Sequence, residues 1–297
     1  AIAGIINWSG SLSSSQLRDV AKRMCDSMVH RGPDDGGVWV SASGDCALGH
    51  RRLSIIDLSE GGRQPMSDES GSTWVSFNGE IYNFQKLRKK LAAEGHHFCT
   101  QTDSEVLPHL FEEMAPSKIS ELDGMYAFSV WSEGDRRLLL ARDPFGKKPL
   151  YYSEGPGWFA FASELQALRC IPDFDAEIDR EALASYLLTG YISAPHSIFR
   201  GARKLPPGHY LEWKFSSTGK PHIFIGRHAD FLPQQPSGFV NQKGRLEKLR
   251  GLLIEAVDKR LVSDVPLGAF LSGGVDSSLV AAIATKELGR SLKTFTI

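Results

Sequence analysis

The segment Ser272-Gly-Gly-Val-Asp-Ser-Ser278 follows the apolar run 265–271 and opens a helical pattern. In this position two glycines let the backbone approach an anion closely, and the helix adds the positive end of its dipole. Asp276 can reach a magnesium ion, and the hydroxyls of Ser272 and Ser277 can donate to phosphate oxygens. The segment therefore predicts a phosphate site at the start of an α/β unit.

A glycine turn with a serine N-cap is the purely structural alternative for this segment. The Walker type of phosphate loop is disfavoured, because it needs a lysine after its second glycine and none is present. The pattern S-G-G-x-D-S resembles instead the pyrophosphate loop of enzymes that adenylate a carboxylate or a urea carbon.

The residues around this loop predict the opening of a parallel-sheet domain. A helical stripe precedes the loop at Leu246, Leu249, Leu253, Val257 and Leu261. A strand at 265–271, a helix at 277–288 and a strand at 292–297 then give a βαβ start. Two strands cannot bury both faces of a parallel sheet, so residues 245–297 are expected to begin a larger, truncated ATP-binding domain. The proline- and glycine-containing segment 231–244 has no hydrophobic period and predicts a linker.

Composition favours small-molecule chemistry in a two-domain chain. The 297 residues are 41% hydrophobic, and 34 Lys and Arg against 35 Asp and Glu leave a formal charge of -1. No basic run suggests nucleic acid or a membrane surface, and no apolar run or charged start suggests a span or a signal peptide. The four cysteines lie far apart, which argues against a zinc site and a disulfide framework. A cytoplasmic location is expected.

The first 230 residues predict antiparallel sheets with helices. Ser13 to Ser15 should cap a helix whose apolar face is Leu17, Val20, Met24 and Met28, and Asp179 should cap another that runs through 188. Further helices are expected at 84–94 and 105–114, the latter shortened by Pro108. Strands are expected at 74–77, 126–131, 137–142 and 158–162, with turns at Asn78-Gly79 and 133–135.

Four polar clusters, each flanked by apolar residues, lie in this front half. They are His30-Arg-Gly-Pro-Asp34, His50-Arg-Arg-Leu-Ser-Ile-Ile-Asp57, Phe77-Asn-Gly-Glu-Ile-Tyr-Asn83 and Thr102-Asp-Ser-Glu105. Singly, each fits a structural role: arginine in a strand usually snorkels, Asn-Gly usually turns, and Asp before a helix usually caps it. In this order, after Ile2-Ala-Gly-Ile5, they resemble the N-terminal-nucleophile glutaminase domain of class II glutamine amidotransferases. With the loop at 272–278 and the segments 142–152 and 162–165, essentially the whole chain is similar to the glutamine-hydrolysing asparagine synthetase family.

The resemblance implies a glutamine pocket in the front domain. Arg52 would grip the α-carboxylate of glutamine with its two-pronged guanidinium, and Asp103 would hold the α-ammonium. The side chain of Asn78 and the backbone N–H of Gly79 would form the oxyanion hole. Two further residues would complete the pocket: Ile56 and Glu80.

The chain departs from the family at the nucleophile. The family begins Cys-[Gly/Ser/Ala]-Ile-x-Gly, and the matching register here is Ala1-Ile2-Ala3-Gly4. Either the cysteine lies immediately before Ala1, removed, modified or left out of this sequence, or Ala1 replaces it with one residue deleted. The terminal thiol attacks the amide carbon and its own α-amine acts as the base, so no internal cysteine can take over. A chain that truly starts at Ala1 is expected not to hydrolyse glutamine.

The resemblance further implies a second site, at which ATP and Mg²⁺ activate a carboxylate. Glutamine would be hydrolysed to glutamate and ammonia, and ammonia would pass internally to the adenylated acceptor, releasing AMP and pyrophosphate. Leu271 and Ile297 would border the adenine nucleotide, and Asp276 would hold the metal ion. The nucleotide residues implied are Leu271, Ser272, Gly273, Gly274, Asp276, Ser277 and Ile297. No prosthetic group is expected.

Aspartate is the favoured acceptor, which makes asparagine the expected product, although other carboxylates remain open because fold kinship does not choose a substrate. A glutamine-binding or ammonia-dependent form without a nucleophile is the alternative. A stand-alone glutaminase is disfavoured, because it would not need a pyrophosphate loop.

The expected fold is an αββα sandwich of two antiparallel sheets over 1–230, followed by a partial parallel-sheet, Rossmann-like domain. A homodimer is possible, but no sequence feature marks its interface.

Overall fold

The computed structural model describes residues 1–215, 221–229 and 242–296, which form two compact units. The first unit comprises Ala1–Ser54 and Ser59–Asp230, and the second comprises Ile55–Leu58 and Phe231–Ile297. Most of the predicted linker 231–244 lies outside the described residues, and its last three residues already belong to helix α6 (Gln242–Asp258). Within the described ranges, no helix has the length and apolar character needed to cross a bilayer.

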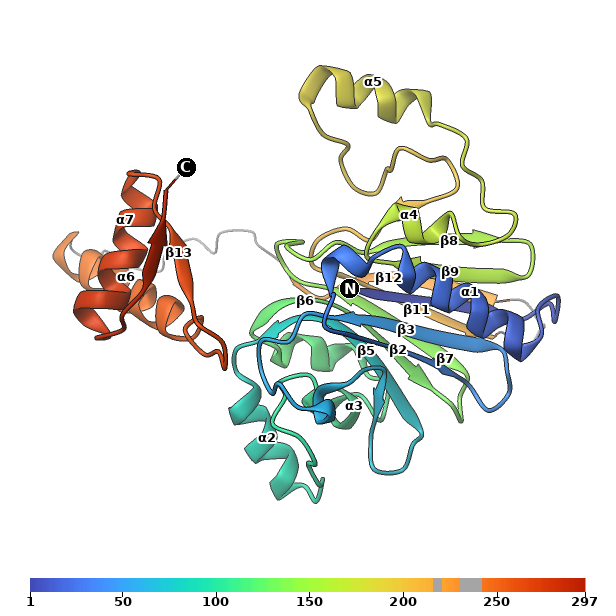
Figure 1. Cartoon of the computed structure of the whole chain (residues 1–297), viewed down its shortest axis with the longest axis horizontal. Helices are drawn as coiled ribbons and strands as arrows, with labels where there is room; N and C mark the ends of the chain where they lie inside the picture. Colours follow the sequence, from blue (N-terminus) through green and yellow to red (C-terminus); the bar gives the residue numbers. More distant parts are fainter. Residues whose placement is uncertain (216–220, 230–241, 297) are drawn as a thin grey trace. The chain divides into compact units, whose positions relative to one another are not determined.

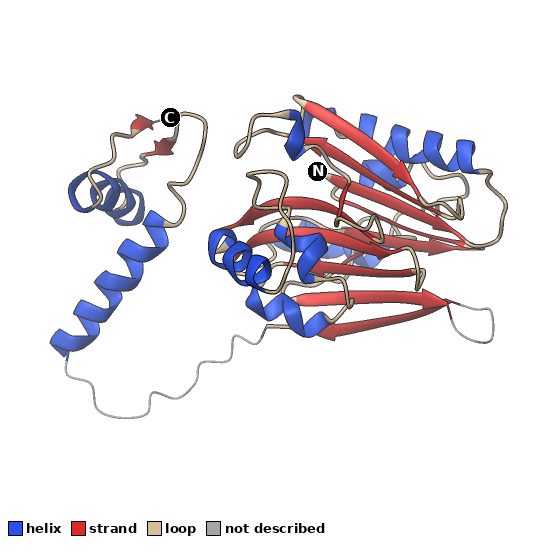
Figure 2. Ribbon diagram, turned by 90° about the horizontal axis from the view of Figure 1, so that it is seen from below, coloured by secondary structure: helices blue, strands red, loops and turns tan. Residues whose placement is uncertain are grey.

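The first unit contains two six-stranded antiparallel sheets. One sheet has the order β10-β8-β9-β1-β3-β2, with β1 (Ile2–Asn7), β2 (Asp35–Val40), β3 (Cys46–Arg52), β8 (Tyr151–Gly155), β9 (Trp158–Ala162) and β10 (Arg203–Lys204). The other has the order β12-β11-β7-β6-β5-β4, with β4 (Met66–Ser67), β5 (Thr73–Ile81), β6 (Gly124–Ser132), β7 (Arg137–Arg142), β11 (His209–Phe215) and β12 (Pro221–Arg227). The two sheets form adjacent layers (Figure 1, Figure 2).

Strand alternation divides the apolar residues of this unit into three cores. On β1, Ile2 and Ile6 point into the cluster between the sheets, whereas Ala3 and Ile5 point outward and pack under α1 (Ser14–Asp26). The outer face of the second sheet packs against α2 (Phe84–Ala93) and α3 (Val106–Leu110). The unit is therefore the predicted αββα sandwich.

The predicted helices largely agree with the structure. Ser13 caps α1 through a capping box with Gln16, and Asp179 Oδ1 caps α5 (Arg180–Thr189). Helix α3 has five residues, as the proline predicted. The remaining helical segments of the unit are η1 (Val29–Arg31), η2 (Glu60–Gly62), η3 (Pro116–Glu121) and α4 (Leu165–Leu168).

The prediction of a turn at Asn78-Gly79 is wrong. Strand β5 runs straight through both residues, and Asn78 lies opposite Ala127 while Gly79 lies opposite Tyr126 on β6. Nine consecutive cross-strand pairs with β6 outweigh the local turn preference of Asn-Gly. By contrast, the predicted turn at 133–135 does connect β6 to β7.

The second unit has the predicted βαβ order with shorter strands. Strands β13 (Gly268–Phe270) and β14 (Lys293–Phe295) pair in parallel, instead of spanning 265–271 and 292–297. Between them lie α7 (Val275–Ala282) and a π-helical turn, η4 (Ile283–Glu287). Its core is small, with Val257, Ile283 and Ala284 buried, whereas Phe270 remains 75% exposed. The short strands follow from this sparse packing, because a pair of strands alone gains little from burial.

Candidate active site

The backbone N–H of Gly79 points away from the strand that pairs with it. On β6, the carbonyl of Tyr126 accepts from the N–H of Asp143 at 2.7 Å, so the backbone groups of Tyr126 point toward β7. Gly79 lies opposite Tyr126, and pairs in an antiparallel ladder alternate between bonded and non-bonded. The N–H of Gly79 therefore points to the side of β5 opposite β6. The short strand β4 pairs with β5 on that side only at Trp74 and Val75, so it does not reach Gly79.

The two neighbouring N–H groups on that edge are hydrogen bonded, unlike that of Gly79. The N–H of Phe77 donates to Gln64 Oε1 at 2.7 Å, and that of Ile81 donates to Asp103 Oδ2 at 2.8 Å. For Gly79, no acceptor occurs among residues 1–215, 221–229 and 242–296. The edge thus presents one unsatisfied donor between two satisfied ones, which is the arrangement that binds an incoming anion.

Glycine is required at this position for steric reasons. A Cβ atom on Gly79 would collide with the carbonyl oxygen of Met125 and would lie 2.8 Å from Tyr126 Cα. Both atoms belong to the backbone of β6 and cannot give way without breaking the ladder. A side chain at Gly79 would therefore separate the strands that aim its N–H group.

The side chains of Asn78 and Glu80 face the space between the sheets. Their neighbours Phe77 and Ile81 are buried in the opposite, outer core, so alternation turns Asn78 and Glu80 toward β1 and β3. Asn78 Nδ2 is buried and has no hydrogen-bond partner among the described residues. Adjacent residues therefore supply two unsatisfied donors, one from a side chain and one from the backbone.

Ala1 lies immediately before β1, which is an inner strand of the other sheet. Its α-amino group donates to the carbonyl of Arg51 at 2.7 Å, and the N–H of Arg51 donates back to the carbonyl of Ala1 at 2.8 Å. Burial, assisted by the positive charges of Arg31, Lys148 and Arg51, lowers the pKa of this amine to about 5. The burial and the positive charges around Ala1 favour the unprotonated form of an amine at this end of the sheet.

Arg52 ends β3, next to the pair formed by Ala1 and Arg51. It is buried, and its Nη1 donates to the carbonyl of Ser59 at 2.8 Å. A Cβ atom on Gly62 would overlap the guanidinium group, so a side chain there would displace Arg52 from its present position. The η2 turn therefore packs closely against the guanidinium.

Two carboxyl groups interact on the β5 side: that of Asp103, which is buried, and that of Glu80, which is half-buried. Burial raises the pKa of Asp103 to about 6, although hydrogen bonds from backbone N–H groups oppose the shift. Burial also raises the pKa of Glu80 to about 7, and the negative charge of Asp103 adds to the effect. Both groups would ionise more readily beside an added cation, which makes them suited to bind an ammonium group.

Lys148 connects the two sheets electrostatically, because its charge acts on the amine of Ala1 and on the carboxyl of Glu80. Burial lowers the pKa of Lys148 itself. Its backbone is held by Asp143, whose carboxylate accepts from the N–H groups of Lys147 and Lys148 at 3.0 and 2.9 Å. Sequence reasoning missed Lys148 and Arg31, although both lie in segments that carried the family resemblance. A charge near the site cannot be inferred from spacing alone.

Comparisons with known proteins identify the family of the chain. Residues 1–222 match the family model described as glutamine amidotransferase domain. The chain belongs to this glutamine amidotransferase family. Residues 248–297 match the model described as asparagine synthase, which confirms the predicted resemblance.

The relatives of this amidotransferase chain include curated proteins from several organisms. It is 37% identical over 294 residues to asparagine synthetase [glutamine-hydrolyzing] 1 of Bacillus subtilis, covering 99% of this chain and 45% of the relative. It is also 37% identical over 282 residues to a putative asparagine synthetase [glutamine-hydrolyzing] of Mycobacterium tuberculosis, covering 91% of this chain and 42% of the relative. The chain thus spans less than half the length of these relatives.

A solved structure confirms the fold. The glutamine phosphoribosylpyrophosphate amidotransferase from B. subtilis, in complex with ADP and GMP, matches with a TM-score of 0.55 and 18% identity, covering 99% of this chain and 65% of that chain. This likeness supports the αββα sandwich and carries no conclusion about substrate.

Three predicted residues belong to the part of the chain assigned to the second unit: Ile56, Leu271 and Ile297. Ile56 lies in the segment Ile55–Leu58, which belongs to the second unit, where the N–H of Asp57 donates to Asp264 Oδ2 at 2.7 Å. Its part in the glutamine pocket stays a prediction. Leu271 donates its N–H to the carbonyl of Phe295, so it stands at the end of β13 as expected, and Ile297 lies outside the described residues.

The loop at 272–278 has the form of an anion cradle. Gly273 adopts a φ of 78°, and no atom lies within 4 Å of where its Cβ would stand. Gly274 is the N-cap of α7 and supplies no side-chain acceptor, so first-turn N–H groups stay available. Ser272 Oγ and Ser277 Oγ lie 3.1 Å apart at the loop mouth, and Asp276 is exposed in the first turn. These residues fit a polyphosphate.

Proposed function

We propose that the protein is a glutamine-dependent amidotransferase, whose first unit hydrolyses glutamine to glutamate and ammonia. The observation that carries this proposal is the pair of unsatisfied donors on β5, Asn78 Nδ2 and the Gly79 N–H. The same unit holds the buried Arg52, the buried Asp103 and the half-buried Glu80. Donors placed for a developing oxyanion are worth about 10²–10³ in rate for acyl transfer.

The register of β1 and β3 supports a nucleophile immediately ahead of Ala1. Ile2 pairs with His50 and Ala1 exchanges hydrogen bonds with Arg51, so a preceding residue would lie opposite Arg52. By alternation, its side chain would face the space between the sheets, as the side chain of Ile2 does. That is also the side toward which Asn78 and Glu80 point. We therefore favour a cysteine before Ala1 over replacement of the cysteine by Ala1.

Substrate glutamine would lie between Arg52 and the two carboxyl groups. Arg52 would bind the α-carboxylate through parallel hydrogen bonds, while Asp103 and Glu80 would bind the α-ammonium. The thiolate then attacks the amide carbon, and Asn78 and Gly79 donate to the oxygen that becomes negative. The α-amine of the cysteine takes the thiol proton and returns it to the leaving ammonia, and water hydrolyses the resulting thioester to release glutamate.

Ammonia would then react with an acceptor at the second unit. The loop residues Ser272, Gly273, Gly274 and Ser277 would hold the phosphates of ATP, with Asp276 facing Mg²⁺, and Leu271 and Ile297 would border the adenine ring. ATP supplies activation of a carboxylate as an acyl adenylate. Aspartate is the proposed acceptor because the matched relatives are asparagine synthetases. A cytoplasmic location and a homodimer are part of this proposal.

Mass, activity and binding measurements test the proposal in sequence. Intact-mass analysis of the natural N-terminus should find a cysteine ahead of Ala1, and that form should release glutamate from glutamine. Replacing this cysteine by serine should abolish the release of glutamate while leaving glutamine binding intact. Glutamine binding without glutamate release in the natural form would instead identify a binding or ammonia-dependent protein. A lack of aspartate-dependent AMP formation would exclude asparagine synthesis.

A further inference from the structure

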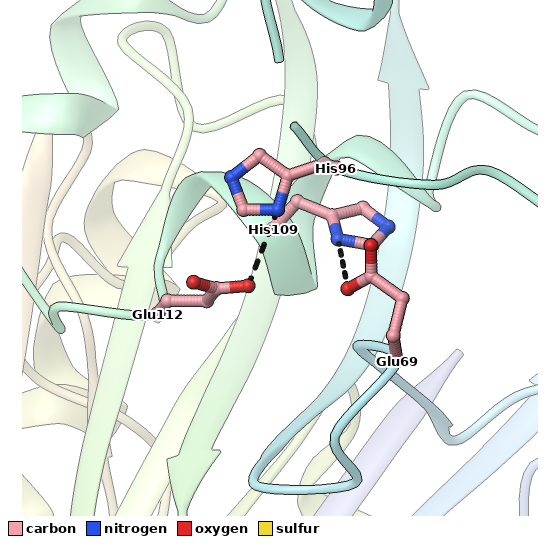
Figure 3. Close-up of side chains that lie close together, drawn as sticks. All are labelled: Glu69, His96, His109 and Glu112. Atoms are coloured by element: carbon pink, nitrogen blue, oxygen red, sulfur yellow. Dashed lines mark ion pairs between the residues drawn. The ribbon is translucent and has the colours of Figure 1, made fainter. Parts of the chain in front are cut away.

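Four metal-ligating side chains gather on the first unit, apart from the proposed glutamine pocket. Glu69 lies in the turn between β4 and β5, His96 follows α2, His109 lies in α3, and Glu112 follows α3. Each offers one ligand atom, and these four atoms lie within 4.8 Å of one another (Figure 3). The set is thus assembled from three chain segments that tertiary folding brings together.

The spacing of the four atoms is close to that of a tetrahedral zinc site. His109 Nδ1 lies 3.1 Å from Glu69 Oε2, and His96 Nδ1 lies 3.3 Å from Glu112 Oε1. Ligands about 2.0–2.1 Å from Zn²⁺ stand about 3.3 Å apart along a tetrahedral edge. The longer separations can close by rotation of Glu69 and Glu112, whose side chains are 36% and 39% exposed.

The buried Nδ1 atom of His109 has no hydrogen-bond partner among the described residues. Its side chain is 2% exposed, and although Glu69 Oε2 is within ion-pair distance, Nδ1 has no aligned hydrogen bond among the described residues. The ring packs against the rings of Phe98 and His96, with centroids 4.7 and 5.1 Å away, which restricts its rotation. Nδ1 is therefore held toward the cluster and lacks a partner that a metal ion would provide.

The surrounding hydrogen bonds orient the carboxylate of Glu69. Glu69 Oε1 accepts from the N–H of His97 at 2.5 Å, which leaves Oε2 toward His109. Neighbouring Asp68 is occupied, because its oxygens accept from Ser70, Ser72 and Thr73 within the hairpin turn. A ligand held by an outer hydrogen bond in this way is typical of metal centres.

The ligand types select the metal ion. Two imidazole nitrogens with two carboxylate oxygens suit Zn²⁺, whereas Mg²⁺ and Ca²⁺ require six or more oxygens. Two carboxylates and two neutral imidazoles would also balance the charge of a divalent cation. We propose that Glu69, His96, His109 and Glu112 bind one Zn²⁺ ion. The ion would join the β4–β5 turn and the chain after α2 to α3.

The site would have a structural effect on the segment between its two histidines. That segment, 97–108, contains Asp103, whose carboxylate accepts from the N–H of Ile81 on β5. A metal ion bound to both His96 and His109 would close the segment 97–108 into a loop that contains Asp103. The inference on zinc binding stands on the four ligands alone and does not depend on the proposed glutaminase activity.

Zinc titration of the full chain tests the proposal. Metal-free protein with Cys99→Ser, which removes the exposed thiol, should bind one Zn²⁺ by calorimetry, and zinc should raise its unfolding temperature. Co²⁺ should give the visible spectrum of tetrahedral nitrogen and oxygen coordination. Glu112→Gln and His96→Gln should each weaken zinc binding by at least about tenfold, since both remove a ligand at an accessible position.

Matched controls make the result decisive. His97→Gln and Glu113→Gln change neighbouring exposed residues of the same types outside the cluster, and they should leave the zinc affinity unchanged. His109→Gln should remove binding, and the two more accessible variants decide the matter if this buried change prevents folding. Absence of stoichiometric binding would overturn the proposal. So would equal weakening by His97→Gln, or an affinity unaffected by Glu112→Gln and His96→Gln.

Discussion

Asp103→Asn should stabilise the first unit at neutral pH while removing glutamine binding. The carboxyl of Asp103 is 7% exposed, and burial raises its pKa from 3.8 to about 6. A shift of about two pKa units corresponds to about 3 kcal/mol of unfavourable free energy for the ionised form. Asparagine has nearly the same shape, carries no charge, and can still accept from the N–H of Ile81.

The sign of the effect depends on pH. Because the folded state binds the proton of Asp103 more tightly than the unfolded state, the wild type loses stability as pH rises from 3.8 to about 6. The variant has no such loss. The free energy of unfolding of the variant should therefore equal that of the wild type below pH 3.8. Above pH 6 it should be higher than that of the wild type by up to about 3 kcal/mol.

Urea unfolding followed by tryptophan fluorescence measures this difference. All six tryptophans lie between Trp8 and Trp213, so the signal reports the first unit alone. Asp19→Asn, on the exposed face of α1, is the control and should change stability by less than about 0.5 kcal/mol at every pH. A less stable Asp103→Asn at pH 8, or a difference independent of pH, would refute the reasoning.

The same ionisation should control substrate affinity. An α-ammonium group needs the ionised forms of Asp103 and Glu80, whose pKa values are raised to about 6 and about 7. The KM for glutamine should therefore fall as pH rises through this range, and bound ammonium should move the midpoint to lower pH. A KM that is constant between pH 5 and 8 would separate these carboxyl groups from substrate binding.

Three further substitutions test the remaining parts of the site. Asn78→Ala should lower kcat for glutamate release by about 10²–10³-fold with little change in KM, and an unchanged kcat would remove Asn78 from the oxyanion hole. Arg52→Lys should raise the KM for glutamine about tenfold or more, because lysine cannot form two parallel hydrogen bonds, and calorimetry showing equal affinity would contradict this role. Asp143→Ala should destabilise the first unit by on the order of 3 kcal/mol in urea unfolding, because four backbone N–H groups, including those of Tyr126 and Lys148, lose an acceptor.

Local chemistry was sufficient to predict much of the fold from the sequence. The caps at Ser13 and Asp179, the short helix at Pro108 and the alternating strands depend on neighbouring residues, and the structure contains them. The order of polar clusters was likewise enough to indicate the family. These features can be predicted from the sequence because each arises from contacts between residues close together in the chain.

Other features depended on packing between distant segments. The pairing of β5 with β6 turned an expected turn at Asn78-Gly79 into a strand and left the Gly79 N–H without an acceptor. The raised pKa of Asp103 and the approach of His96 and His109 to Glu69 likewise arise only when separate elements pack together. The sequence by itself determined which residue types were available and where most of the helices and strands would form. Tertiary structure alone decided which donors stayed unsatisfied and which charges were buried, because hydrogen-bond pairing and desolvation are set by neighbours far away in the chain.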